Sequence, residues 1–265
     1  MRTRLLVAAL ACCLSGIARA DPPAPDLGGR TPLDLTGPTP AALSAGTLVA
    51  TDDAAIAVAD CADPAPGQLL WLPADDADAA KHERERIAAT HGVARERDVL
   101  VLTPKDGQPL RFTDWAMPER ADADGDFVRY RYAGTLEGSG WWRVEVQYGH
   151  DAPSSWLVNP ASGHAVHVHN GGEVATLSQD GRWLATFDVN AAPFRLALVF
   201  LGEGAPTLAV DCLFAGKGRY APIACGFRDA RYEARWGKAG FALERTRDGW
   251  QLLGNAPGGE CRAPR

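Results

Sequence analysis

The clearest pattern along this chain is the alternation of apolar and polar residues from about residue 98 onward. In the segment FVRYRYAG (127–134), Val128, Tyr130 and Tyr132 alternate with arginines. Such alternation is typical of an antiparallel strand with one buried face. Many similar segments follow, separated by turns rich in Gly, Asp, Asn and Pro, and no long helix interrupts them. The pattern predicts a mainly β fold, an antiparallel meander that is propeller-like or a sandwich, and it excludes Rossmann and TIM-barrel arrangements.

One helix is predicted near the N-terminus, from Asp76 to His91. Asp75 or Asp76 can cap its free amides, and Gly92 stands where a left-handed stop residue is expected. The helix is rich in charged residues and has few large apolar ones, so we expect it to lie on the surface of a sheet.

The first twenty residues have the form of a secretory signal peptide. A basic start precedes an apolar run from Leu5 to Leu14, and Ala18-Arg19-Ala20 fits a cleavage site. Lipidation at Cys12 or Cys13 is the alternative, although the residues before them fit a lipidation site poorly. We therefore expect a periplasmic or secreted protein with no transmembrane segment in the mature chain.

Composition divides the chain further. Residues 21–45 are rich in proline and lack apolar periodicity, which favours a flexible lead-in. The expected parts are a signal peptide (1–20), a Pro-rich lead-in (21–45), a small α+β segment (46–94) and an antiparallel β domain (95–265).

Charge and cysteine content narrow the function classes. With 27 basic and 33 acidic residues, the net charge is −6, and no basic stripe marks a nucleic-acid site. Four cysteines follow the leader, and an even number in an exported chain predicts two disulfides. Of the three possible connectivities we favour Cys212 with Cys225 and Cys61 with Cys261, because the first two lie on neighbouring strand-like segments.

A four-strand unit is visible in residues 154–189. It contains the turn Asn159-Pro160-Ala161-Ser162-Gly163 and the run Ser178-Gln179-Asp180-Gly181-Arg182-Trp183-Leu184-Ala185. Asp180 can hydrogen-bond to its own backbone, and Gly181 accepts the positive φ of a hairpin corner. The unit resembles one blade of the Tol-associated bacterial β-propellers, except that Gln179 replaces their usual proline.

A second resemblance covers several short motifs. Tyr130-Arg131-Tyr132-Ala133-Gly134, Trp142-Arg143-Val144, Tyr148 and Leu157-Val158-Asn159 are similar to the motif order of uncharacterised secreted bacterial β-rich proteins. That resemblance implies no activity.

Three histidines form the most suggestive metal candidate. On a strand, His167 and His169 of HAVHVH face the same way, so with His164 they offer imidazoles to one ion. A further ligand would have to come from another strand, and an exposed polar face is the alternative. The acidic run 122–126 does not fit a calcium loop, because its sixth and twelfth positions hold Phe127 and Ala133.

Tryptophans give the candidate binding residues. Trp141 and Trp142 are adjacent and must point to opposite faces of a strand, so one of them can meet a partner; Trp156 lies nearby. The alternative is that neighbouring loops cover them.

No nucleophile or metalloprotease signature is present, and no cofactor is expected. We therefore expect a non-catalytic protein that binds another protein or a cell-wall component, one form of which is an inhibitor or immunity-type protein for a secreted hydrolase. The alternatives are a secreted hydrolase with carboxylates from separate strands and a metal-binding envelope protein.

Overall fold

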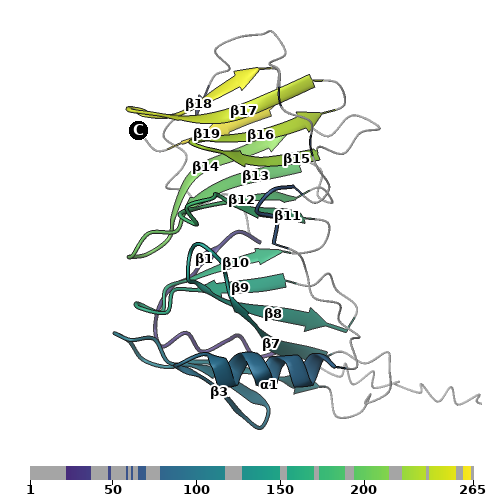
Figure 1. Ribbon diagram of the computed structural model, residues 1–265, viewed down its shortest axis with the longest axis vertical. Helices are drawn as coiled ribbons and strands as arrows, with labels where there is room; N and C mark the ends of the chain where they lie inside the picture. Colours follow the sequence, from purple (N-terminus) through teal and green to yellow (C-terminus); the bar gives the residue numbers. More distant parts are fainter. Residues whose placement is uncertain are drawn as a thin grey trace, which may run out of the picture.

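Four β-sheets and one helix make up the fold (Figure 1). The computed structural model describes residues 22–36, 47–48, 58, 61, 65–69, 78–116, 127–149, 154–169, 173–188, 194–214, 223–236, 239–254 and 259–263. Within these residues the predicted mainly β fold with a single N-terminal helix is confirmed. No helix in this part of the chain is long and apolar enough to cross a membrane.

The helix and the first sheet form one end of the molecule. Helix α1 (Ala79–Ala89) has no buried residue, as its charged sequence predicts, and it packs through half-buried Ile87. It begins three residues later than expected, and the proposed caps Asp75 and Asp76 lie outside the described residues. Gly92 ends the turn after the helix with a φ of 84°. Sheet A follows, with strands β3 (Val93–Glu96), β4 (Val99–Leu102) and β5 (Leu110–Thr113).

Sheet B is a six-stranded meander in the order β1-β10-β9-β8-β7-β6. All its neighbours are antiparallel except β1, which pairs with β10 in parallel. Its strands are β1 (Leu33–Asp34), β6 (Trp115–Ala116), β7 (Phe127–Thr135), β8 (Trp142–Tyr148), β9 (Ser154–Val158) and β10 (Ala165–His169).

The C-terminal half contains the other two sheets. Sheet C has the order β11-β12-β13-β14-β19-β2 and sheet D the order β15-β16-β17-β18, both antiparallel. The strands of sheet C are β2 (Thr47–Leu48), β11 (Glu173–Leu177), β12 (Trp183–Asp188), β13 (Phe194–Phe200), β14 (Thr207–Phe214) and β19 (Gly259–Arg262). Those of sheet D are β15 (Ile223–Arg228), β16 (Arg231–Trp236), β17 (Ala239–Thr246) and β18 (Gly249–Gly254).

The sheets stack face to face, because the period-two pattern gives each central sheet two apolar faces. One face of sheet B, including Val144 and Val158, packs against sheet A. The opposite face, including Leu157, packs against sheet C. Sheet C in turn presents Phe187 and Leu196 to sheet D. Figure 1 shows the result as an open column with sheets A and D at opposite ends, and the described strands form no closed barrel.

Two disulfides are present, as the even cysteine count predicts, and they are consistent with folding in an oxidising compartment. The favoured pairing, however, is wrong: Cys212 bonds to Cys261, and Cys61 bonds to Cys225. The cause is the strand order. The C-terminal strand β19 inserts beside β14 and places Cys261 directly opposite Cys212, which spacing along the sequence does not reveal.

The proline-rich lead-in also differs from expectation. Its residues 22–36, here called the strap, lie along sheets A and B, whereas the prolines favour a flexible segment. The Arg30 guanidinium donates to three backbone carbonyls, those of Leu27, Gln108 and Ser162. The amide of Leu35 donates to the carbonyl of His167. The predicted boundary between residues 94 and 95 falls within β3, so helix α1 and sheet A are continuous with the β region.

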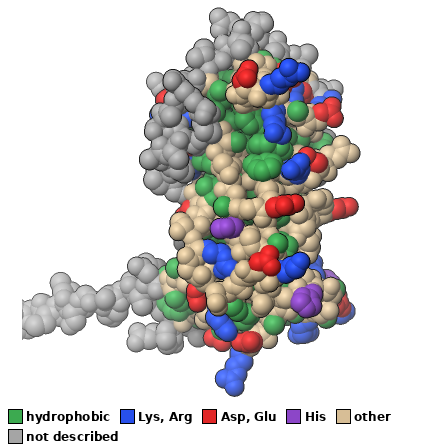
Figure 2. Space-filling model, turned by 90° about the vertical axis from the view of Figure 1, so that its left-hand side faces the viewer, with side chains coloured by type: hydrophobic (Ala, Val, Ile, Leu, Met, Phe, Trp, Pro, Cys, Tyr) green, Lys and Arg blue, Asp and Glu red, His purple; other side chains and the backbone are tan. Residues whose placement is uncertain are grey.

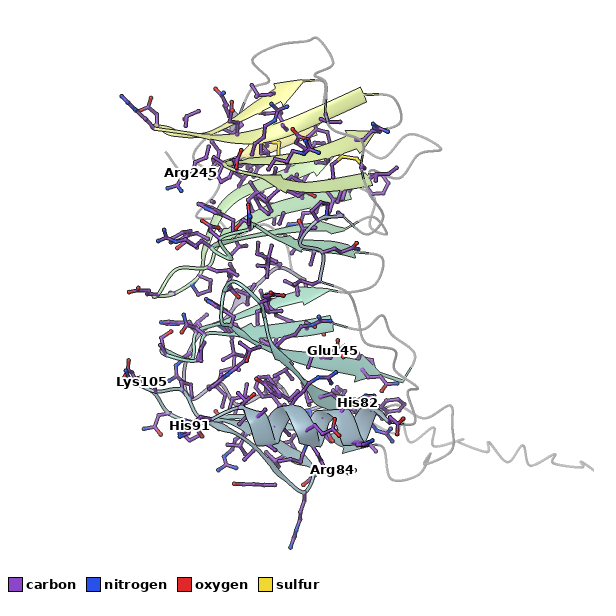
Figure 3. All side chains as sticks on the ribbon, in the orientation of Figure 1. His82, Arg84, His91, Lys105, Glu145 and Arg245 are labelled. Carbon is purple, nitrogen blue, oxygen red and sulfur yellow. A yellow bond between two sulfur atoms is a disulfide. The ribbon has the colours of Figure 1, made fainter. Side chains whose placement is uncertain are left out.

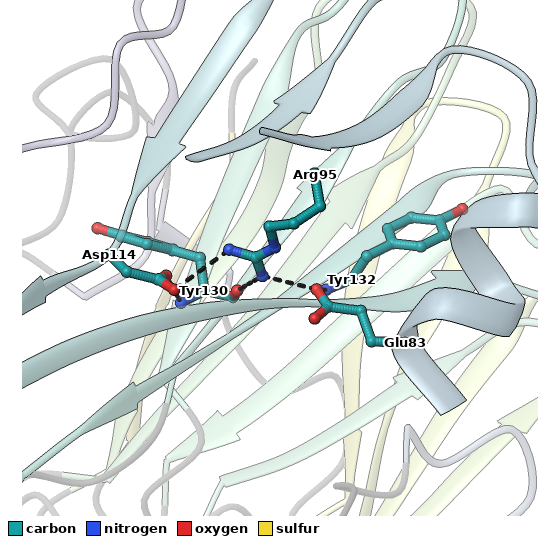
Figure 4. A network of polar contacts seen from close by, with 5 residues as sticks. All are labelled: Glu83, Arg95, Asp114, Tyr130 and Tyr132. Atoms are coloured by element: carbon teal, nitrogen blue, oxygen red, sulfur yellow. Dashed lines mark hydrogen bonds and ion pairs between the residues drawn. The ribbon is translucent and has the colours of Figure 1, made fainter. Parts of the chain in front are cut away.

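A polar network covers the edge of sheet B beyond the short β6 (Figure 4). Arg95 pairs with Glu83 of α1 at 2.7 Å and with Asp114 at 3.2 Å, and it also donates to the carbonyl of Tyr130. The same carboxylates accept the amides of Tyr132 and Tyr130, at 2.8 Å each. Side chains thus replace a neighbouring strand on β7, which blocks pairing with another chain. Burial raises the pKa of Asp114 above its usual range.

Candidate functional site: the loop edge and its aromatic–arginine surface

The structure describes two of the three side chains of the predicted histidine site, those of His164 and His167. His167 contacts Ser154 Oγ through Nε2 at 3.0 Å and Asp34 Oδ1 through Nδ1 at 3.5 Å, and its ring stacks on Trp156. His164 is half-buried in the turn before β10, and the side chain of His169 lies outside the described residues. Among the described residues, no group of three His, Cys, Asp or Glu side chains is placed to hold a metal. A metal site at His164, His167 and His169 therefore stays a prediction.

Ser154, His167 and Asp34 have the connectivity of a catalytic triad, but their setting does not suit a nucleophile. Ser154 is 0% exposed, and its hydroxyl is also 3.2 Å from the hydroxyl of Tyr148. A substrate cannot reach this oxygen in the folded protein. We interpret the chain of contacts as structural, with His167 joining the strap to sheet B.

The predicted tryptophan contacts differ from expectation as well. Trp141 and Trp142 do point to opposite faces of sheet B, since Trp142 joins the core shared with sheet A and Trp141 the core shared with sheet C. Both faces are covered, so the two side chains are only 3% and 5% exposed. Trp156 is also buried. A partner cannot use these rings as exposed anchors, because the sheets stack on both sides.

Residues 178–183 form the expected hairpin turn, and the hydrogen bonds of the turn explain why Ser178 and Asp180 occupy these positions. The Ser178 hydroxyl donates to Asp180 at 2.6 Å and accepts the amide of Trp183, while Asp180 also accepts the amide of Arg182. Gly181 has a φ of 65°, and a Cβ there would lie 2.3 Å from the carbonyl carbon of Gly138. The turn is therefore fixed internally and packed directly on the neighbouring turn of sheet B.

Turns from three sheets meet along one edge of the column, here called the loop edge: residues 103–109, 136–141, 159–163, 178–182 and 201–206. Asn159 joins two of them, since its Oδ1 accepts the amides of Ala161 and Ser162 and its Nδ2 donates to the carbonyl of Gly202. The amide of Asp106 donates to the carbonyl of Ala161. These bonds hold turns of sheets A, B and C in fixed positions.

The loop edge is hollowed by a groove of about 640 Å³. Its walls carry three carboxylates, those of Asp106, Asp180 and Glu203, together with the guanidinium of Arg182. Partial burial is the largest single influence on the pKa of Asp180 and raises it, but the hydrogen bonds from Ser178 and Arg182 together with the charge of Arg182 outweigh burial, so the pKa lies below its usual range. The groove is thus rigid, open and mainly acidic.

Beside the groove lies a cluster of half-buried aromatic rings and exposed arginines, here called the aromatic–arginine surface. Trp183 lies 5.0 Å from both Phe200 and Trp250, measured between ring centroids. The guanidinium of Arg245 lies 5.2 Å from the Trp183 ring, and that of Arg182 lies 5.6 Å from the Phe200 ring.

The register explains this cluster. Trp183 faces Phe200 across β12 and β13, and Arg245 faces Trp250 across β17 and β18. Figure 2, which looks onto this edge, shows hydrophobic and basic side chains together in the upper half, and Figure 3 places Arg245 there. The surface therefore spans sheets C and D with its charges already desolvated on one side by aromatic rings.

Sequence reasoning identified the hairpin but not this surface. Trp183 lies on the same face of β12 as Phe187, but Phe187 is buried in the core shared with sheet D, whereas Trp183 lies at the end of the strand and contacts Trp250 and Arg245. The available signal was the tryptophan directly after a tight turn, which places an aromatic ring at the end of a sheet.

Comparison with family models, curated proteins and solved structures finds no match to this chain.

Proposed function

We propose that this chain is a non-catalytic periplasmic or secreted protein that binds another protein through the loop edge and the aromatic–arginine surface. The observation that carries the proposal is the cluster of Trp183, Phe200 and Trp250 with two stacked arginines. Tryptophan and arginine are enriched among the residues that dominate binding energy at protein interfaces.

The rigidity of the loop edge supports the same proposal. Turns that are tied by Asn159 and packed at Gly181 lose little conformational freedom on binding. A preorganised surface therefore retains more of its contact energy as affinity. An inhibitor or immunity-type protein for a secreted hydrolase needs such a surface and no chemistry of its own.

The charge distribution indicates the chemistry of the partner. The aromatic–arginine surface suits an apolar patch that carries acidic groups, while the acidic groove suits a basic side chain. Both features lie on one edge, so a single partner surface can contact them together.

The proposal is tested by capture from a periplasmic extract, followed by activity assays of any captured hydrolase. We expect a partner at about one copy per chain, whose activity falls when the complex forms. The absence of any stoichiometric partner would contradict the proposal.

A further inference from the structure

A second cleft lies away from the loop edge, between the strap and sheet B. We propose that this cleft binds a small ligand with an aromatic or other apolar body and a cationic amine group. The inference is independent of the proposed protein-binding function.

The size and lining of the cleft indicate a small molecule. Its volume is about 560 Å³, within the usual range for ligand sites. Prolines of the strap form one wall, and Tyr130, Tyr148, Trp156 and His167 form the other. Most of this lining is apolar, so the body of the ligand must be apolar too.

The charges of the cleft select a cation. Asp34 is a half-exposed carboxylate at the cleft. Its Oδ1 accepts hydrogen bonds from the amide and the hydroxyl of Thr36 and lies 3.5 Å from His167 Nδ1. These contacts lower the pKa of Asp34, so the carboxylate is ionised at any ordinary pH. Arg30 also lines the cleft, but its guanidinium donates to three backbone carbonyls and is already committed. An ammonium group therefore finds a carboxylate, whereas an anion finds no uncommitted arginine among the residues lining the cleft.

The phenol groups favour the same ligand class. Tyr130 and Tyr148 present electron-rich rings, which attract cations. Burial raises the pKa of Tyr130, so this phenol stays neutral and does not add charge of its own. A protonated amine close to Asp34 and these rings would be stabilised by the carboxylate and by the rings together.

The cleft is preformed over most of its length because the strap is fastened at two points, Asp26 and β1. Asp26 and Arg111 exchange backbone hydrogen bonds at 2.9 and 2.8 Å. At the other end, β1 pairs with β10 and the carbonyl of Leu35 accepts from Arg195 at 3.0 Å. A ligand therefore does not have to order the strap between Asp26 and β1 when it binds.

The test uses isothermal titration of the full mature protein with three isosteric probes: 2-phenylethylamine, 2-phenylethanol and phenylacetate. We expect the amine to bind about tenfold more tightly than the alcohol, because the free energy of a hydrogen bond to a charged group corresponds to about a tenfold change in affinity. Phenylacetate should bind most weakly. Absence of amine binding, or equal binding of all three probes, would overturn the proposal.

Two variants locate the binding. Asp34→Asn should reduce amine affinity about tenfold and leave the alcohol unchanged, while Asp229→Asn removes the same charge from an exposed turn of sheet D and should change neither. Because Asp34 also contacts His167, Ala24→Trp provides a second test. Ala24 is exposed on the strap wall of the cleft, so the larger ring should block the amine without touching that contact. Amine binding of wild-type strength in Ala24→Trp would overturn the proposal.

Discussion

The two halves of the column have similar apolar cores but are secured by different chemistry. The N-terminal half, with helix α1 and sheets A and B, is tied by charged side chains: the Arg95 network at the edge of β7 and the Arg30 contacts of the strap. The C-terminal half, with sheets C and D, also has a buried ion pair, between Arg195 and Asp211, but its distinguishing feature is the two disulfides. The cores themselves are alike, because alternating strands fill each interface between sheets.

This difference follows from the groups and segments that have to be fixed in place in each half. The edge of β7 leaves backbone groups without a strand partner, and only polar side chains can satisfy them. In the C-terminal half, β19 and the segment at Cys61 come from distant parts of the chain, and covalent bonds fix them against sheets C and D. We therefore expect the halves to respond to different perturbations.

The largest effect is expected from removal of the disulfide between Cys212 and Cys261. The cysteines are 49 residues apart, so the double change to alanine should lower the free energy of unfolding by about 2–5 kcal/mol. Alanine is preferred to serine because both positions are fully buried. Urea denaturation measures the loss, and hydrogen exchange should show that sheets C and D open before sheets A and B. Equal opening of both halves would contradict the comparison.

Loss of Arg95 should affect the N-terminal half instead. Arg95→Met leaves the partly buried carboxylates of Glu83 and Asp114 without their cation, which we expect to cost about 2–3 kcal/mol. Arg84→Met changes an exposed arginine on helix α1, next to Glu83, and should cost less than about 0.5 kcal/mol. The same urea titration compares the two, with hydrogen exchange of β7 as a local probe. Equal stability of the two variants would show that the network does not hold this edge.

The junction between the halves can be tested at two glycines. Gly181→Ala places a Cβ against the backbone of Gly138 and also strains a positive φ, so we expect a loss of about 2 kcal/mol. Gly140→Ala has a φ of 72° but open space around it, and should show only the cost of the backbone strain, about 1 kcal/mol. The difference between their thermal midpoints reports the packing of sheet B on sheet C. Identical midpoints would indicate that the turns do not press together.

The smallest expected effect is the loss of the Asp34 contribution to stability at acidic pH. Since the pKa of Asp34 is lower in the folded protein than its unfolded value of 3.8, its contribution is complete above that pH and is lost as pH falls below it. Asp34→Asn should therefore destabilise the strap at neutral pH by less than about 1 kcal/mol, because the carboxylate is half exposed. Unfolding curves of both proteins should converge toward pH 2. If the stability difference between wild type and Asp34→Asn grew as the pH fell, the predicted direction of this pH dependence would be contradicted.

Local features of the fold could be predicted from sequence, and long-range ones could not. The alternation in 127–134 and the turn at Asp180 and Gly181 depend on neighbouring residues, and both have the expected form. The pairing of Cys212 with Cys261 depends on where β19 inserts, and the order of the strap depends on acceptors 78 and 132 residues from Arg30.

The candidate site shows the same limit. The tryptophans at 141 and 142 point to opposite faces as predicted, yet no local pattern indicates that both faces are covered. Trp183 and Trp250 belong to different sheets and meet only because sheets C and D stack. Which aromatic rings stay accessible is therefore a property of the stacking and not of any one strand.

The most direct test of the account is capture of the partner by charge-reversed variants. Arg245→Glu places a carboxylate beside the Trp183 ring within the aromatic–arginine surface, while Arg84→Glu makes the same change on helix α1 at the opposite end of the column (Figure 3). We predict that wild type and Arg84→Glu capture the same stoichiometric partner from a periplasmic extract and that Arg245→Glu does not. Capture of that partner equally by all three proteins would contradict it.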